Sequence, residues 1–155
     1  MQMSTSDYAI PNGVTWTYEK SRLCAETFGR PATELEMDCH IGVFQDGQWT
    51  ATPVRALWDT GTTFTIITPE VASKLPLVKL DRKIGLNGMN VHGESDLYLA
   101  AVIFPNGRKF GPIAVAVQPL PSVDVLLGMN VILGGTFAIM RKPDGGTRFT
   151  FDMNV

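Results

Sequence analysis

Residues 55–67 read R-A-L-W-D-T-G-T-T-F-T-I-I, and this stretch decides how the rest of the chain is interpreted. An apolar run brings one carboxylate, Asp59, to a turn that contains Gly61, and a β-branched run follows. A carboxylate next to a buried strand is costly unless it is hydrogen-bonded or has a chemical role. Asp59 is therefore a candidate functional residue. The structural alternative is a turn aspartate, because Asp-x-Gly is common in turns.

The composition describes an ordinary globular protein. The chain has 155 residues, 45% of them hydrophobic and 18% charged, which favours one folded domain. The net charge of −2 gives no reason to expect nucleic acid or an anionic membrane as a partner. The start of the chain lacks the pattern of a secretory signal, and no apolar run reaches the ~18–20 residues of a membrane span. We expect a soluble protein of the cytoplasm, or one packaged in a particle.

Strand and turn signals repeat at short intervals from about residue 37 onward. Three hairpins are predicted, each around a turn that contains glycine. Two short helices are predicted, at 68–75 after a hydroxyl cap and at 129–133 before two glycines. Many hairpins and few helices indicate a mostly-β barrel or sandwich. The predicted hairpin strands are 39–44 with 49–57, 96–104 with 110–117, and 137–142 with 147–151.

Residues 1–36 differ from the remainder. They lack an evident strand pattern, and residues 18–28 are predicted to form a short helix. This N-terminal extension is either a free arm or a packed part of the fold, and both alternatives stay open. The remaining residues, 37–155, form the predicted domain.

A second informative segment, 123–132, reads V-D-V-L-L-G-M-N-V-I. It predicts a buried strand, then Gly128, then a short helix. Together with Asp-Thr-Gly at 59–61, the Leu-Leu-Gly-Met-Asn at 126–130 resembles the retropepsin-like aspartic proteases. The sequence after Gly134 and Gly135 is similar to prokaryotic or phage-type members. A second Asp-Thr-Gly or Asp-Ser-Gly is absent from the chain.

The resemblance implies an acid-protease barrel with one lobe per chain. Asp59 would be the catalytic residue, Thr60, Gly61 and Thr62 would hold its loop, and Gly128 would support the loop from behind. Peptide hydrolysis in this family uses two carboxylates that share one proton. Because the chain has one such aspartate, a homodimer with Asp59 from each subunit on the two-fold axis is expected.

The resemblance also places a flap over the site. Three glycines fall within nine residues before a long hairpin strand, and glycine suits a mobile tip that approaches substrate closely. The implied flap comprises Gly85, Leu86, Asn87, Gly88, Met89, Asn90, Val91, His92 and Gly93. The implied partners are a peptide or protein substrate and a second copy of the chain. The implied chemistry needs no metal or cofactor, and strand 147–153 is implied to contribute to an intersubunit sheet.

Other interpretations concern the same residues. The chain could be a catalytically silent dimerisation or peptide-binding module of this fold, or a protease that acts only on its own precursor. Asp124 lacks the Thr-Gly context of a second catalytic acid and is expected to cap a turn. His40 and His92 lack the spacing of zinc ligands. Cys24 and Cys39 are expected to be reduced thiols without a nucleophilic role.

Overall fold

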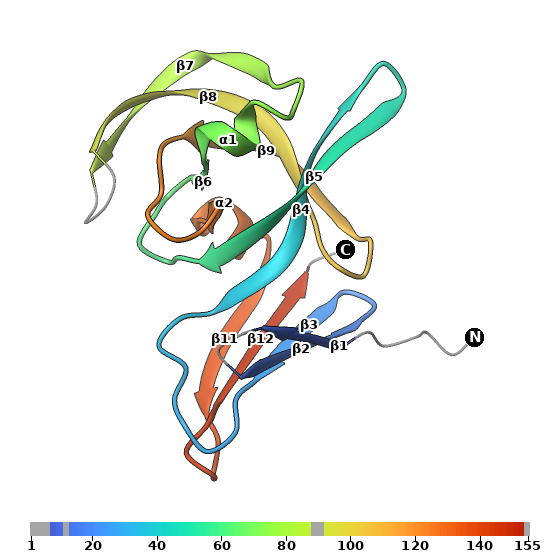
Figure 1. Cartoon of the computed structure of the whole chain (residues 1–155), viewed down its shortest axis with the longest axis vertical. Coiled ribbons are helices and arrows are strands. Elements are labelled where there is room, and N and C mark those ends of the chain that lie inside the picture. Colours follow the sequence, from blue (N-terminus) through green and yellow to red (C-terminus); the bar gives the residue numbers. More distant parts are fainter. Residues whose placement is uncertain (1–6, 11–12, 88–91, 154–155) are drawn as a thin grey trace.

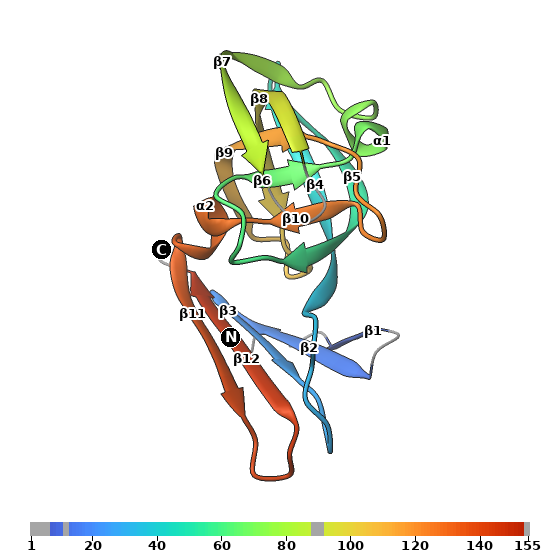
Figure 2. The same cartoon turned by 90° about the vertical axis from the view of Figure 1, so that its left-hand side faces the viewer.

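The structure, a computed structural model, describes residues 7–10, 13–87 and 92–153 of the chain. Strands dominate these residues, and the two helices have four residues each. A barrel forms the upper part of the molecule and a second sheet lies below it (Figure 1 and Figure 2). The prediction of a mostly-β barrel with one or two short helices is confirmed.

The barrel is built from a seven-stranded sheet in the order β4-β5-β10-β6-β9-β8-β7. Strand β4 also pairs with β8, so the sheet closes on itself and leaves β7 outside the ring. Two of the pairings are parallel, β10 with β5 and β6 with β9. The strands are β4 (Glu36–Gln45), β5 (Gln48–Trp58), β6 (Thr65–Ile67), β7 (Val78–Asn87), β8 (His92–Ile103), β9 (Lys109–Val117) and β10 (Val125–Leu127).

The lower sheet has five strands in the order β1-β2-β3-β12-β11. It joins the two ends of the chain, because β12 lies between β3 from the N-terminal segment and β11. Phe151, for example, is opposite Leu23 on one side and Phe137 on the other. The strands are β1 (Asp7–Ile10), β2 (Val14–Glu19), β3 (Arg22–Glu26), β11 (Gly135–Arg141) and β12 (Thr147–Met153).

The helix predicted at 18–28 is wrong, because this region forms the β2–β3 hairpin. Lys20, at φ 48°, makes the turn between the two strands. Burial alternates along β2, with Val14, Trp16 and Tyr18 inside the molecule and Thr15 exposed. Threonines between large apolar residues are a strand pattern, which the sequence analysis missed. The extension is thus packed into the fold; its boundary at residue 36 stays a prediction.

The implied place of strand 147–153 in an intersubunit sheet stays a prediction, but β12 has no open edge at which a partner strand could pair. Both edges of β12 are paired within the chain, so neither is free for a partner. The alternation expected for this strand is confirmed, since Phe149, Phe151 and Met153 are all buried.

The other predicted elements lie where they are expected. The three hairpins are β4–β5, β8–β9 and β11–β12. Helix α1 (Pro69–Ala72) follows Thr68, whose hydroxyl accepts a hydrogen bond from the Val71 N–H at 3.4 Å. Helix α2 (Met129–Ile132) follows Gly128. No helix within the described ranges has the length and apolar character to cross a membrane. Both cysteines are free thiols.

One hydrophobic core runs through the barrel and the lower sheet. At its centre, the Trp58 ring lies 5.0 Å from the Phe151 ring and 5.2 Å from the Phe149 ring, measured between centroids. Phe149 in turn meets Trp16 edge-on at 5.4 Å. Trp58 is the last residue of β5 and comes directly before Asp59. The packing between the two sheets therefore fixes the point where the Asp59 loop begins.

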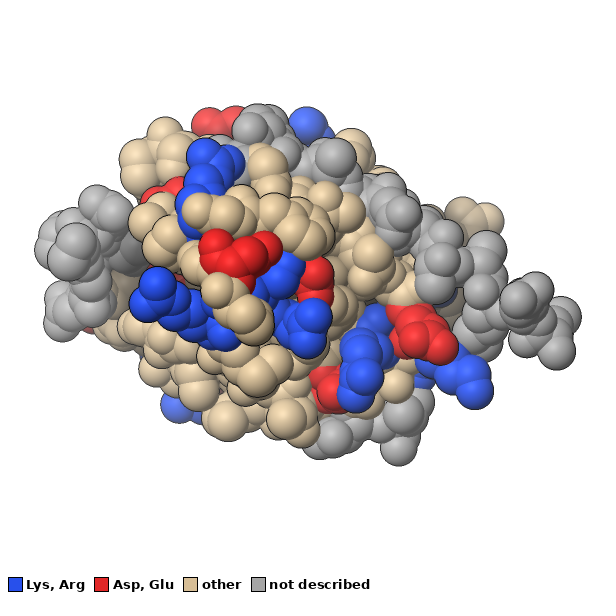
Figure 3. Space-filling model, turned by 90° about the horizontal axis from the view of Figure 1, so that it is seen from below, with Lys and Arg blue, Asp and Glu red and all other residues tan. Residues whose placement is uncertain are grey.

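Charged groups are dispersed over the lower part of the molecule. Seen from below, acidic and basic side chains are intermingled (Figure 3). Several are paired across the lower sheet, as Lys142 is with Glu26 at 3.4 Å and Arg22 with Asp152 at 2.8 Å. This face therefore lacks the single-sign field that binding to a polyanion requires.

Candidate active site

The Asp59 loop begins where β5 leaves the barrel. The backbone N–H of Asp59 donates to the carbonyl of Leu127 in the neighbouring strand β10, at 2.9 Å. The Asp59 side chain is half-buried, and its Oδ1 accepts a hydrogen bond from the Gly61 N–H at 2.8 Å. Its second oxygen has no hydrogen-bond partner among the residues that the structure describes. One oxygen is thus fixed by the loop and the other is available to a ligand or a water.

Gly128 lies directly behind this loop. A Cβ at Gly128 would come within 2.6 Å of the Phe64 carbonyl oxygen and 2.9 Å of the Thr62 carbonyl oxygen, which is closer than atoms can approach. The first amides of α2 hold the same segment, because Met129 N–H donates to the Thr62 carbonyl at 2.8 Å. The loop and the Gly128 turn are in direct contact, and only glycine leaves the space for it.

A polar cluster that the sequence analysis did not single out completes this support. Asn130 Oδ1 accepts from the Thr65 N–H at 3.0 Å and from the Thr65 hydroxyl at 2.9 Å. The Asn130 amide donates to the Ala114 carbonyl in β9 at 2.8 Å, and Gly128 N–H donates to the Thr65 hydroxyl at 3.2 Å. In the sequence, the feature that indicates this cluster is Asn130, two residues after Gly128.

The three loop residues after Asp59 have different surroundings. Thr60 is exposed, and its hydroxyl makes no hydrogen bond with any residue in the described ranges. A Cβ at Gly61 would lie only 3.1 Å from Asp59 Oδ1. The Thr62 hydroxyl donates to the Phe64 carbonyl at 3.0 Å and so closes the loop on itself. Thr60 is the member of this group that faces outward.

Asp59 opens onto a pocket of about 310 Å³ between the barrel and the lower sheet. One wall is the connection from β3 to β4, which is tied down at two points. Ala32 N–H donates to the Thr147 hydroxyl at 2.8 Å, and Trp58 N–H donates to the Leu35 carbonyl at 3.1 Å. The lining residues are Ala32, Thr33, Glu34, Leu35, Leu57, Trp58, Asp59, Thr60, Phe137, Ile139 and Thr147.

The predicted flap falls on the hairpin of β7 and β8. Its described part pairs Gly85 with Glu94, Leu86 with Gly93 and Asn87 with His92. Gly88, Met89, Asn90 and Val91 lie outside the described residues. Leu86 is buried in a small apolar cluster with Ile66 of β6, the strand that follows the Asp59 loop. The end of β7 next to the hairpin turn therefore shares an apolar cluster with the element that follows the candidate site.

A larger pocket, of about 500 Å³, lies on the outer side of β4 and β5 and does not include Asp59. Its charged groups are already engaged. Arg55 pairs with Glu36 at 2.8 Å and with Asp38 at 3.2 Å, and the Asp124 carboxylate accepts from the Arg55 backbone N–H at 2.8 Å. The Asp124 carboxylate thus ties the segment before β10 to β5, and its printed partner lies 69 positions away rather than in the local turn that was expected. Asp124 lies outside an Asp-Thr-Gly turn, so this pocket lacks the motif of the candidate catalytic acid.

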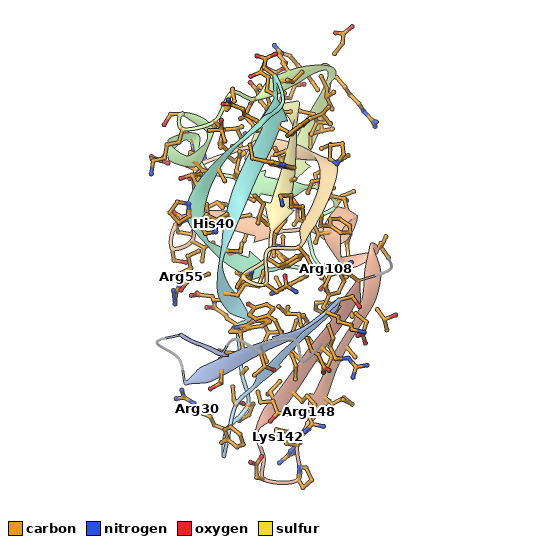
Figure 4. All side chains as sticks on the ribbon, turned by 90° about the vertical axis from the view of Figure 1, so that its right-hand side faces the viewer. Arg30, His40, Arg55, Arg108, Lys142 and Arg148 are labelled. Carbon is orange, nitrogen blue, oxygen red and sulfur yellow. The ribbon has the colours of Figure 1, made fainter. Side chains whose placement is uncertain are left out.

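Cys39 and His40, which the sequence analysis disfavoured as a nucleophile and a metal ligand, also line this pocket. His40 and Arg55 lie on the barrel, well above Arg30, Lys142 and Arg148 of the lower part (Figure 4). Burial raises the pKa of the Cys39 thiol, which keeps it protonated and unreactive. In the described ranges, no three His, Cys, Asp or Glu side chains gather as a metal site would require.

Comparisons with known proteins identify the family of this chain. Residues 46–133, more than half of the chain, match the family model described as "gag-polyprotein putative aspartyl protease". The chain therefore belongs to the retropepsin-like aspartic protease family. No curated protein sequence matches it significantly. The crystal structure of a retropepsin-like aspartic protease from Rickettsia conorii is similar at 16% identity, with 88% of this chain and 99% of that chain covered and a TM-score of 0.48.

Proposed function

We propose that the protein is a homodimeric aspartic endopeptidase in which Asp59 of each subunit forms the catalytic pair. The observation that carries this proposal is the set of contacts that the Asp59 carboxylate makes within its Asp-Thr-Gly turn. One oxygen is anchored by the Gly61 N–H at 2.8 Å, while the other has no partner among the described residues and borders a pocket. Asp124 also accepts one backbone N–H and borders a pocket, but it lies outside an Asp-Thr-Gly turn, so the motif distinguishes Asp59. Membership in an aspartic protease family supports a catalytic role for this carboxylate.

The proposed reaction uses water and the two carboxylates alone. The ionised Asp59 removes a proton from a water whose oxygen attacks the scissile carbonyl carbon. The protonated Asp59 of the second subunit donates its proton to the carbonyl oxygen, which gives a neutral tetrahedral intermediate. The first Asp59 then passes the proton it took from water to the leaving nitrogen, the C–N bond breaks, and the second Asp59 takes the proton of one hydroxyl as the carbonyl of the product acid forms. Two acids a few ångströms apart share one proton, so the activity should have an optimum in acid solution.

The remaining predicted site residues have supporting roles in this proposal. Gly61, Thr62 and Gly128 hold the loop, and the outward-facing Thr60 bonds across the dimer to the partner's loop. The segment Gly85 to Gly93 closes as a flap over an extended peptide, which binds through its backbone like an added strand. We propose that the protein works in the cytoplasm or packaged in a particle.

The test is cleavage of a peptide library at about pH 4–6, the range in which such a pair holds one proton, by wild type and by Asp59→Asn. Asparagine keeps the shape and can still accept from the Gly61 N–H, so folding should be unchanged. Loss of the acid should lower turnover by at least about 10²-fold. A pepstatin-like inhibitor should abolish the wild-type activity.

Two outcomes would contradict the proposal. Turnover by Asp59→Asn would remove Asp59 from the chemistry, and peptide binding without cleavage by wild type would identify an interaction module. Cleavage restricted to the protein's own precursor would keep the mechanism and identify a self-processing enzyme.

A further inference from the structure

We propose that the pocket beside Asp59 selects substrates that carry a lysine or arginine side chain near the scissile bond, and that Glu34 binds the positive charge. The inference rests on the proposed function, because it assigns a substrate class to the same site. It goes further by naming the residue of this chain that sets the preference. Glu34 is a specificity-determining residue in this proposal, and the bond cleavage stays with Asp59.

The charged side chains around this pocket are all of one sign. Among the described residues that line it, two are charged, Glu34 and Asp59, and both are acidic. Arg30 borders a neighbouring pocket together with Glu34 but does not line this one. A concave site whose charged groups are acidic attracts a cation and repels an anion. The pocket therefore favours a basic side chain over an acidic one.

The Glu34 carboxylate is available to a ligand. Glu34 is exposed, and its side chain makes no hydrogen bond or ion pair with any other residue that the structure describes. Acids close to it in the sequence are engaged, as Glu36 is with Arg55 at 2.8 Å and Glu26 with Lys142 at 3.4 Å. A substrate cation at Glu34 therefore has no competing cation within the fold to displace.

The backbone that carries Glu34 is fixed on both sides. Ala32 N–H donates to the Thr147 hydroxyl at 2.8 Å, and the Leu35 carbonyl accepts from the Trp58 N–H at 3.1 Å. Trp58 directly precedes the candidate catalytic acid, so the second bond ties the Glu34 segment to the strand that leads to this acid. These anchors limit how far the Glu34 charge can move relative to the reacting bond, which discrimination between side chains requires.

The larger side chains of the pocket suit the stem of a basic residue. They are apolar and include Leu57, Phe137 and Ile139. Lysine and arginine lay a hydrocarbon stem along an apolar surface while the charged end stays in a wet, polar position, such as the exposed Glu34 provides. A volume of about 310 Å³ is at the small end of ligand pockets and suits a single side chain. Because the proposed dimer is two-fold symmetric, the pocket occurs once on each side of the cut.

The test compares pairs of peptides that differ only in lysine against norleucine, which has the same hydrocarbon stem without the ammonium group. Each position on both sides of the cut is varied in turn, at about pH 6, where an ordinary glutamate is ionised. The wild-type kcat/KM should be about three- to tenfold higher for the lysine peptide at one or more positions, a modest gain because water screens an exposed ion pair. Glu34→Gln should bring the two kcat/KM values close together. Glu34→Lys should favour glutamate over lysine at the same position.

Glu70→Gln is the matched control, because Glu70 is an exposed glutamate of helix α1 that does not line the Asp59 pocket. This variant should keep the lysine preference of wild type. Equal cleavage of lysine and norleucine peptides by wild type, or an unchanged preference in Glu34→Gln, would overturn the inference; an inactive Asp59→Asn beside either result would leave the proposed function intact. Absence of cleavage of every peptide by wild type would instead overturn the proposed function itself.

Discussion

Asn130 connects three segments around the candidate site through one amide group. Its oxygen serves Thr65, and its nitrogen serves Ala114 in β9. Thr65 is fully buried, so its N–H has no access to water if the Asn130 oxygen is removed. The Asn130 side chain thus provides the hydrogen-bond acceptor for the first residue of β6, the strand that follows the Asp59 loop.

We predict that Asn130→Ala destabilises the protein by about 1–3 kcal/mol, the usual cost of leaving a buried polar group without a partner. Asn130→Asp is the matched control, because a carboxylate still accepts from Thr65 and loses only the bond to Ala114. The aspartate variant should lie between wild type and alanine in urea unfolding. Equal stability of wild type and Asn130→Ala would show that the network contributes nothing.

The sequence indicated part of this site and missed part of it. Asp59 and Gly128 could be predicted because each lies in a short motif of neighbouring residues, Asp-Thr-Gly at 59–61 and Leu-Leu-Gly-Met-Asn at 126–130. The bonds of Asn130 to Thr65 and Ala114 could not, because they join residues 65 and 16 positions away. Such distances are set by the fold and leave no local pattern.

At the scale of elements, the junction of β10 and α2 positions the Asp59 loop. The turn at Gly128 and the first amides of the helix both contact residues 62–64. The contacting atoms at Gly128 belong to the backbone, so the loop cannot avoid an added methyl group by rotating a side chain.

We predict that Gly128→Ala moves the Asp59 loop. Overpacking of this kind costs about 1–3 kcal/mol, and a shift of about 1 Å in a catalytic group can lower turnover by about 10²-fold. Unfolding and peptide cleavage by the same preparation measure both effects. Gly85→Ala is the control for stability, because a Cβ there meets no atom within 4 Å. A Gly128→Ala enzyme with normal stability and turnover would contradict the proposed support.

The residues in the turns explain both why the hairpins could be predicted and why the N-terminal strands were missed. Turns such as Asp46-Gly47, where both residues have positive φ, are specified by the residues that form them. The alternation of Val14, Trp16 and Tyr18 with threonines was equally local. The helix expectation for 18–28 failed because the Lys20 turn carries no glycine or proline to mark it.

At the scale of the molecule, the N-terminal segment is part of the core. Trp16 is 0% exposed, contacts Phe149, and donates its indole N–H to the Glu36 carbonyl at 2.8 Å. Loss of one such tryptophan costs about 3–5 kcal/mol, against a typical total stability of about 5–15 kcal/mol.

We therefore predict that deletion of residues 1–35 abolishes cooperative folding. The deletion removes β1, β2 and β3, so it also leaves one edge of β12 unpaired. Thr15→Ala, at an exposed position of β2, is the control and should change thermal unfolding little. Circular dichroism melts and solubility measurements distinguish the two variants. A soluble, cooperatively melting protein without residues 1–35 would show that the segment is a dispensable arm.

This whole-molecule arrangement could not be predicted from the sequence. The Thr27–Thr147 hydrogen bond that extends the β3–β12 pairing joins residues 120 positions apart. The hydrophobic pattern of each strand indicates a buried face but does not identify the neighbouring strand. The family resemblance indicated an intersubunit role for β12, and the N-terminal segment of the same chain pairs with one of its edges.

Because β3 completes the sheet around β12 within one chain, no second copy is needed to fill that edge. For the homodimer proposed above, association would then follow mass action and would not be required for folding. The proposed hydrolysis would be weak at high dilution, while each chain stays folded. Confinement of many copies in a small volume, or fusion of two copies in tandem, would raise it.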